Sequence, residues 1–256
     1  MRLRLRPRGS RTVIAERHFH APLGSVRASY PDASGTAFVV TTHPAGGVLG
    51  GDRLDVRVEL AEGARATLLD QGATQAYRGS PARRRTVLRV ADGAVLEHLP
   101  HHVIPFAGSS LALETRFELD ATGTLIAWDA LAAGRVARGE RFAFDRLSSR
   151  TVLLRRGLPV VRDGVELGRG GEPFAGASYL GAGYVAAPMD LAPLADEIHE
   201  ALIGGRGVLG SASAPVMGVC VARVLCEGAP ELYESLGRVR ALARRALGLV
   251  PAPQIA

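Results

Sequence analysis

The chain has 256 residues, of which 47% are hydrophobic and 22% are charged, a composition typical of a globular protein with one large domain or two small ones. No segment approaches the ~20 consecutive apolar residues of a membrane helix, and the N-terminal MRLRLRPR lacks the apolar region of a secretory signal peptide. The two cysteines are too few for a disulfide framework or a four-thiolate zinc site. We therefore expect a cytoplasmic protein without a membrane partner.

All 31 basic residues are arginine, and the formal net charge is +6. The absence of lysine excludes a Schiff-base lysine and the lysine of a phosphate-binding P-loop. Residues 1–17 hold six arginines and one glutamate, and a basic arm of this kind can bind nucleic acid. No cluster of basic and aromatic residues follows it, so a solvated terminal strand is the favoured interpretation and no nucleic-acid partner is expected.

Alternation of apolar and polar residues dominates the first 165 residues and predicts β-strands. One apolar face is formed by Leu54, Val56, Val58 and Leu60, and a second by Leu111, Leu113, Thr115, Phe117 and Leu119. Short glycine-containing turns separate such runs, and glycine supplies the positive φ that tight hairpins require. They are predicted at Glu62-Gly63, Asp92-Gly93, Thr122-Gly123 and Asp163-Gly164.

Three of these glycines, Gly63, Gly93 and Gly123, are thirty residues apart, within the similar segments LAEGARATLL, VADGAVLEHL and LDATGTLIAW. A fixed period indicates stacked β-structure in which each repeat covers the apolar face of the next. Chance recurrence of hairpin turns is the alternative explanation.

The last 70 residues predict two helices around a strand. The first helix begins near Asp190, buries Leu191, Leu194, Ala195, Ile198 and Leu202, and ends at Gly204-Gly205. The second follows Pro230, ends at Gly248, and has Leu232, Leu236, Val239, Ala243 and Leu247 on one face. The segment 216–225 is predicted to be a strand. No polar linker interrupts the sequence, so residues 1–256 are expected to form a single domain, mainly β, with stacked β-helix-like sheets and two α-helices in the C-terminal third.

The most glycine-dense segment is HPAGGVLGGDR at 43–53. It cannot be a P-loop, because Asp52 stands where that loop needs lysine and would repel a phosphate. Two interpretations stay open: a pair of β-turns, or backbone packed closely around a carboxylate that points into a cavity.

Three histidines, His98, His101 and His102, cluster in LEHLPHHVIPF. Imidazole binds nickel, zinc and copper, but no accompanying metal motif is present, and a surface loop is favoured. A hydrolase that uses a histidine–carboxylate pair is the alternative function. Cys220 and Cys226 are predicted to be core residues.

Six segments occur together in an order and spacing that resemble the UreD family of urease accessory proteins, called UreH in some bacteria. They are HPAGGVLGGD (43–52), GATQAYR (72–78), LEHLP (96–100), IPFAGS (104–109), AWD (127–129) and GRVARGE (134–140). The resemblance is strong over residues 15–165 and follows only the general pattern in the C-terminal third.

The resemblance implies a predominantly β, stacked-sheet fold and no catalytic activity. It implies a scaffold or chaperone in metallocentre assembly, which binds the accessory protein UreF, reaches the GTPase UreG through UreF, and docks on apo-urease. It also implies that Ni²⁺ passes transiently through an internal channel, with no tightly bound cofactor.

Four residues at matching positions are implied to line that channel: Asp52, Thr74, Asp129 and Asp163. Oxygen ligands can replace the hydration of a divalent ion, and several weak sites release an ion more readily than one tight site. For Asp129 a strand-end cap is an alternative role, and for Asp163 a plain hairpin turn. Glu140 in the last motif is also explained by an ion pair with Arg135 or Arg138.

Overall fold

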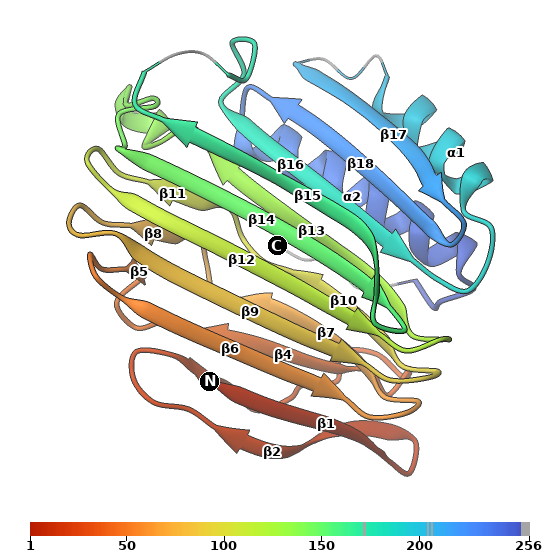
Figure 1. Ribbon diagram of the computed structural model, residues 1–256. Coiled ribbons are helices and arrows are strands. Elements are labelled where there is room, and N and C mark those ends of the chain that lie inside the picture. The colour runs from red at the N-terminus through yellow and green to blue at the C-terminus, as the bar shows by residue number, and fades with distance from the viewer. Residues whose placement is uncertain (171–172, 204, 206, 252–256) are drawn as a thin grey trace.

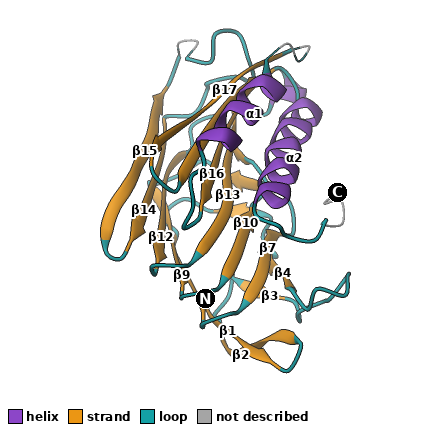
Figure 2. Ribbon diagram, turned by 90° about the vertical axis from the view of Figure 1, so that its right-hand side faces the viewer, coloured by secondary structure: helices purple, strands orange, loops and turns teal. Residues whose placement is uncertain are grey.

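The computed structural model describes all residues except 171–172, 204, 206 and 252–256. Two large sheets lie face to face, and two helices cover the outer face of the second sheet, which gives three layers (Figure 2). The fold is therefore mainly β with stacked sheets and two helices, as the sequence predicts. No helix among the described residues is long and apolar enough to cross a bilayer.

The first sheet has seven strands, which follow one another across the sheet in this order (Figure 1): β15 (Leu158–Gly168), β14 (Arg146–Arg155), β12 (Ser110–Leu119), β9 (Ala82–Val90), β6 (Arg53–Leu60), β1 (Arg2–Arg8) and β2 (Arg11–His18). The predicted apolar faces of β6 and β12 both point inward: the four apolar residues of β6 are buried, as are Leu111, Phe117 and Leu119 of β12. The predicted turn at Asp163-Gly164 is wrong, because both residues lie inside β15 and the hairpin turn falls at Arg156-Gly157.

The second sheet has eleven strands. Its main path is β17 (Val208–Val216), β18 (Val219–Cys226), β16 (Tyr179–Ala186), β13 (Thr124–Ala132), β10 (Val95–Leu99), β7 (Arg65–Asp70), β4 (Ala37–Thr42) and β3 (Gly24–Ser25). Three short strands extend it beside β13: β11 (Val103–Pro105), β8 (Thr74–Ala76) and β5 (Gly47–Val48). The predicted strand at 216–225 is in fact the end of β17, a turn, and most of β18.

The thirty-residue spacing is a genuine structural repeat. β6, β9 and β12 are parallel neighbours in the first sheet, and β7, β10 and β13 are parallel neighbours in the second. The connecting turns also stack, since the Gly63 N–H donates to the Asp92 carbonyl and the Gly93 N–H donates to the Thr122 hydroxyl. Each repeat thus covers the apolar face of its neighbour.

Strand β13 shows why the second sheet has apolar residues on both faces. Leu125, Ala127 and Leu131 face the core between the sheets, whereas Ile126 and Trp128 face the helices. A sheet buried on both faces needs near-continuous apolar strands rather than alternating ones. Asp129 is the exception in this strand, and it points into the space between the sheets.

The helices are α1 (Ala192–Leu202) and α2 (Ala229–Ala246), joined in the chain by β17 and β18; a short 3₁₀ turn spans Val136–Arg138. The predicted apolar stripes are buried except for Leu247, which is partly buried. The Asp190 carboxylate accepts the Ala192 N–H at 3.0 Å. The stop of α1 was expected at Gly204-Gly205, of which Gly204 lies outside the described residues; the helix ends at Leu202. Cys220 and Cys226 are buried and free, which confirms their core role.

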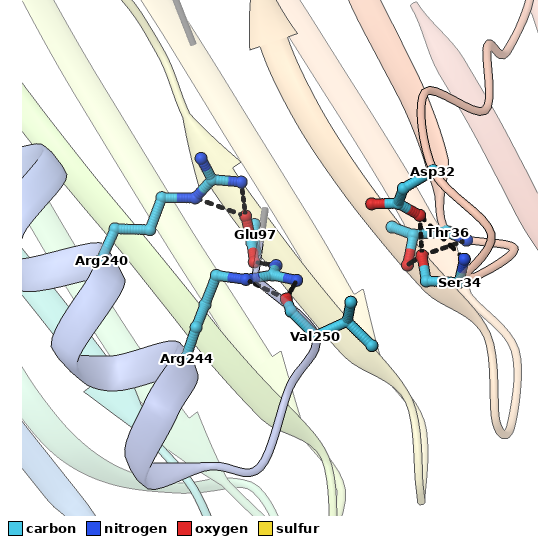
Figure 3. Close-up of polar contacts among 7 residues, drawn as sticks. All are labelled: Asp32, Ser34, Thr36, Glu97, Arg240, Arg244 and Val250. Atoms are coloured by element: carbon cyan, nitrogen blue, oxygen red, sulfur yellow. Dashed lines mark hydrogen bonds and ion pairs between the residues drawn. The ribbon is translucent and has the colours of Figure 1, made fainter. Parts of the chain in front are cut away.

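A buried ion cluster joins α2 to the second sheet (Figure 3). Glu97 on β10 accepts Arg240 Nε at 2.8 Å and also pairs with Arg244, while Arg244 donates to the Val250 carbonyl. The three side chains are 2%, 7% and 10% exposed, respectively. Beside this cluster, Asp32, Ser34 and Thr36 form a hydrogen-bonded turn.

Candidate functional site

Three adjoining cavities lie between the two sheets and form one row across the strands. The β4 cavity, of about 310 Å³, is lined by residues that include Thr41, His43, Asp70, Thr74 and Arg84. Next to it lies the central cavity, of about 40 Å³, and then the β15 cavity, of about 20 Å³. The first two cavities share Asp70, Thr74 and Arg84, and the last two share Asp129, Leu131 and Ser149.

Strand register explains why polar groups gather in this row. On the inner face of the second sheet, Asp129, Ala182 and Arg223 stand in register on β13, β16 and β18. The facing sheet has a second line of polar residues that are paired across neighbouring strands. They are Thr86 on β9, Thr115 on β12, Thr151 on β14 and Asp163 on β15. Parallel repeats bring equivalent positions side by side, so one polar position per repeat produces a continuous polar line between apolar layers.

Asp129 lies at the wall shared by the central and β15 cavities. Its carboxylate accepts a hydrogen bond from Thr151 of the opposite sheet. Burial raises the pKa of Asp129 to about 6, with the charge of Asp163 adding to the effect and the Thr151 hydrogen bond opposing it. This carboxylate has no arginine bonded to it among the described residues, so its charge is the least compensated in the row.

Asp163 lines the β15 cavity from the middle of its strand. It accepts the Tyr184 hydroxyl at 2.7 Å and forms an ion pair with Arg223. The Asp163 side chain is 11% exposed, whereas Arg223 is 44% exposed, so the arginine reaches from the solvent into the end of the row. Burial and the two nearby carboxylates raise the pKa of Tyr184, which keeps it a hydrogen-bond donor.

At the other end, Asp70 is held by two groups. Its Oδ1 accepts the Thr41 hydroxyl and faces Arg84 Nη2 at 3.4 Å. Burial alone would raise the pKa of Asp70, but the Arg84 charge and the Thr41 hydrogen bond outweigh it and hold that pKa below its usual value. Arg84 Nη1 also lies 3.4 Å from the Thr74 hydroxyl.

Of the four site residues expected from the sequence, Thr74, Asp129 and Asp163 line the row of cavities. Asp52 does not line it; its Oδ2 accepts the Leu49 N–H at 2.9 Å in a turn, although its charge acts on His43 in the wall of the β4 cavity. The neighbouring glycines permit close backbone approach, since a Cβ on Gly47 would lie 2.0 Å from the Gln75 carbonyl oxygen. The segment is thus a turn whose glycines fit the loop against β8.

The expected surface loop of histidines is wrong for His98, which lies on β10 in the wall of the central cavity. His101 and His102 lie at the start of the next segment and contact the Tyr233 hydroxyl of α2, with His102 Nδ1 at 2.8 Å. Burial lowers the pKa of both His98 and His102 to about 4. Glu140 pairs with Arg135, one of the two partners considered for it, and accepts the Ala107 N–H at 2.8 Å.

Sequence reasoning missed His43, Asp70, Arg84, Tyr184 and Arg223. Arg84 carried a usable signal, because it shares the strand parity of the inward residues Ala82, Thr86 and Leu88. An arginine on the inward face of an alternating strand needs a buried partner or a cavity. Among the described residues no group of three or more His, Cys, Asp or Glu side chains is arranged to hold a metal ion.

The fold and the site define a class of protein: a β-solenoid sandwich with a polar interior row. The family model described as the UreD urease accessory protein matches residues 1–256, so the chain belongs to the UreD family. It is 33% identical to urease accessory protein UreD of Alkalilimnicola ehrlichii, over 99% of this chain and 88% of that protein. The UreD protein of Pseudomonas entomophila is 32% identical over 99% and 91%. That of Klebsiella aerogenes is 39% identical over 58% and 55%.

Proposed function

We propose that the chain is a non-enzymatic maturation factor for urease, acting in the cytoplasm as a scaffold and a nickel conduit. In this proposal it binds UreF, reaches the GTPase UreG through UreF, and docks on apo-urease. Ni²⁺ is the cargo, taken up transiently through the row of cavities. Membership of the UreD family supports the role in urease maturation.

The observation that carries the conduit is that Thr74, Asp129 and Asp163, distant in the sequence, line adjoining cavities that share walls. The central and β15 cavities have volumes of about 40 and 20 Å³. One water molecule needs ~10–15 Å³ of such space. A fully hydrated Ni²⁺ is larger than these cavities, so side-chain oxygens must replace part of its hydration shell.

The electrostatics favour passage over tight retention. Asp70 and Asp163 each form an ion pair with an arginine, whereas among the described residues Asp129 feels the charges of Arg84 and Arg223 without a direct bond to either. Carboxylate and hydroxyl oxygens spread along a path give successive weak sites, from which an ion can leave again.

The test is co-expression of the chain with urease subunits and the other accessory proteins, followed by nickel analysis of purified urease. The double variant D129N/D163N is expected to lower the nickel content several-fold, because two oxygen anions on the path are lost. The control is D145N, since Asp145 pairs with Arg169 on the surface. Pull-down with UreF shows whether the complex still assembles. Full nickel loading with the chain deleted contradicts the function as a whole.

The hydrolase alternative gains no support from the geometry. A catalytic histidine needs a carboxylate that orients its ring. His98 Nδ1 is buried without a hydrogen-bond partner among the described residues, and His101 and His102 contact Tyr233 instead.

A further inference from the structure

The Asp70 carboxylate and the two histidine rings nearest to it contain buried atoms without hydrogen-bond partners. Within the described part of the chain these atoms are both ring nitrogens of His43, Oδ2 of Asp70 and Nδ1 of His98. Buried polar atoms are nearly always hydrogen-bonded, because burying one without a partner costs about 1–3 kcal/mol. Several such atoms in the walls of two adjoining cavities offer binding groups to a ligand that would satisfy them.

The topology brings these side chains to the carboxyl ends of three neighbouring parallel strands. β7 pairs in parallel with β4 on one side and with β10 on the other. Asp70 is the last residue of β7, His43 directly follows β4, and His98 lies near the end of β10. Asp70 therefore stands between the two histidines.

The Asp70 carboxylate lies in the wall of both the β4 cavity and the central cavity. His43 lines the β4 cavity, His98 lines the central cavity, and Asp70 lines both. The charge of Asp70 acts on each histidine. Thr41 and Arg84 occupy only Oδ1, which leaves Oδ2 available.

The donor atoms suit a borderline divalent cation. Imidazole nitrogen and carboxylate oxygen together bind nickel and zinc, and an imidazole must be neutral to donate its lone pair. Burial lowers the pKa of both His43 and His98, and the Arg84 charge lowers them further, which favours the neutral form of both rings. The same arginine weakens cation binding at Asp70 by charge repulsion.

We propose that His43, Asp70 and His98 form a two-step relay for Ni²⁺, in which Asp70 Oδ2 is the ligand common to both steps. The first step uses His43 and Asp70 in the β4 cavity, and the second uses Asp70 and His98 in the central cavity. The three side chains do not converge on one point, which fits a relay rather than a single tight site. The relay rests on the proposed function and adds nitrogen donors to a path that the sequence predicts to contain only oxygen ligands.

The test is nickel X-ray absorption spectroscopy of the purified full-length chain with one equivalent of Ni²⁺. The relay predicts the multiple-scattering signature of imidazole in the wild type. That signature is lost in H43Q/H98Q, and the affinity for Ni²⁺, measured by equilibrium dialysis, falls at least tenfold. D70N is expected to weaken binding similarly. The matched control is H18Q/H20Q, which removes two exposed histidines.

A wild-type spectrum without the imidazole signature overturns the relay. This outcome does not depend on whether any variant folds. A signature that survives in H43Q/H98Q, or that disappears in H18Q/H20Q, overturns it as well. Failure of the relay is distinguishable from failure of the function. If urease nickel content depends on Asp129 and Asp163 but not on the two histidines, the conduit stands and the relay is wrong. If the relay binds nickel but no variant alters urease loading, the relay stands as a site and the conduit is wrong.

Discussion

Asp129 is a carboxylate between apolar neighbours in strand β13, and its burial carries an energetic cost. Its pKa is about 6, against 3.8 for an unperturbed aspartate. Between these values the unfolded chain has lost the proton while the folded chain retains it. Ionised Asp129 therefore destabilises the fold progressively as the pH rises from about 4, and fully above about 6.

The variant D129N is expected to be more stable than the wild type at pH 7.5. The difference in pKa corresponds to about 3 kcal/mol, and the amide oxygen of the introduced asparagine can still accept the Thr151 hydroxyl. Urea denaturation of D129N and of the wild type, at pH 7.5 and at pH 4, measures the difference in their free energies of unfolding at each pH. The advantage should shrink toward zero at pH 4; a variant less stable than the wild type at pH 7.5 would show that the carboxylate does not destabilise the fold.

The close packing of Gly47 against β8 leads to a second prediction. Its strand β5 pairs with β8, and an added Cβ would lie 2.0 Å from the Gln75 carbonyl oxygen. The variant G47A should lose about 1–3 kcal/mol, the usual cost of overpacking, and should displace the loop that forms a wall of the β4 cavity. The control is G72A, where nothing lies within 4 Å of an added Cβ. Equal thermal melting temperatures for the two variants would contradict this explanation.

At the scale of elements, helix α2 is fixed to the second sheet by the Glu97 cluster as well as by its apolar stripe. The variant E97Q removes the buried negative charge that pairs with both Arg240 and Arg244, and we expect a loss of about 3–5 kcal/mol. The comparison variant is E197Q, whose partner Arg245 and own side chain are 65% and 44% exposed; there a loss below ~1 kcal/mol is expected. Urea denaturation of both variants compares them directly, and similar values would mean that the buried cluster adds no stability.

Local patterns in the sequence predicted most of the elements. The inward faces of β6 and β12 and the buried stripes of both helices follow from periodicity alone. The errors have a common cause. The sequence predicted a turn at Asp163-Gly164 and an uninterrupted strand at 216–225. Only register with a partner strand decides that the first pair lies inside β15 and that a turn after Val216 separates β17 from β18.

At the scale of the whole molecule, the thirty-residue repeat decides where the polar row forms. The resemblance implies channel positions for Thr74, Asp129 and Asp163; all three line the cavities, and their part in nickel passage stays a prediction. Asp70, Arg223 and their contacts could not be predicted, because they depend on which strands become neighbours across the two sheets. His98 was misplaced for the same reason: a proline-rich segment suggested a loop, whereas parallel pairing with β7 and β13 holds it inside.

Passage of Ni²⁺ through the interior row requires open space there, so a larger side chain in the row should block it. Ala182 lies between Asp129 and Arg223 in the wall of the β15 cavity of about 20 Å³, so A182V fills that space without changing any charge. The matched control is A112V, in register with the exposed Arg83 on the outer face of β12. The measurement is nickel per urease active site after co-expression. The conduit predicts a several-fold loss in A182V with the complex still assembled and no loss in A112V; equal, full nickel loading in both variants would contradict it.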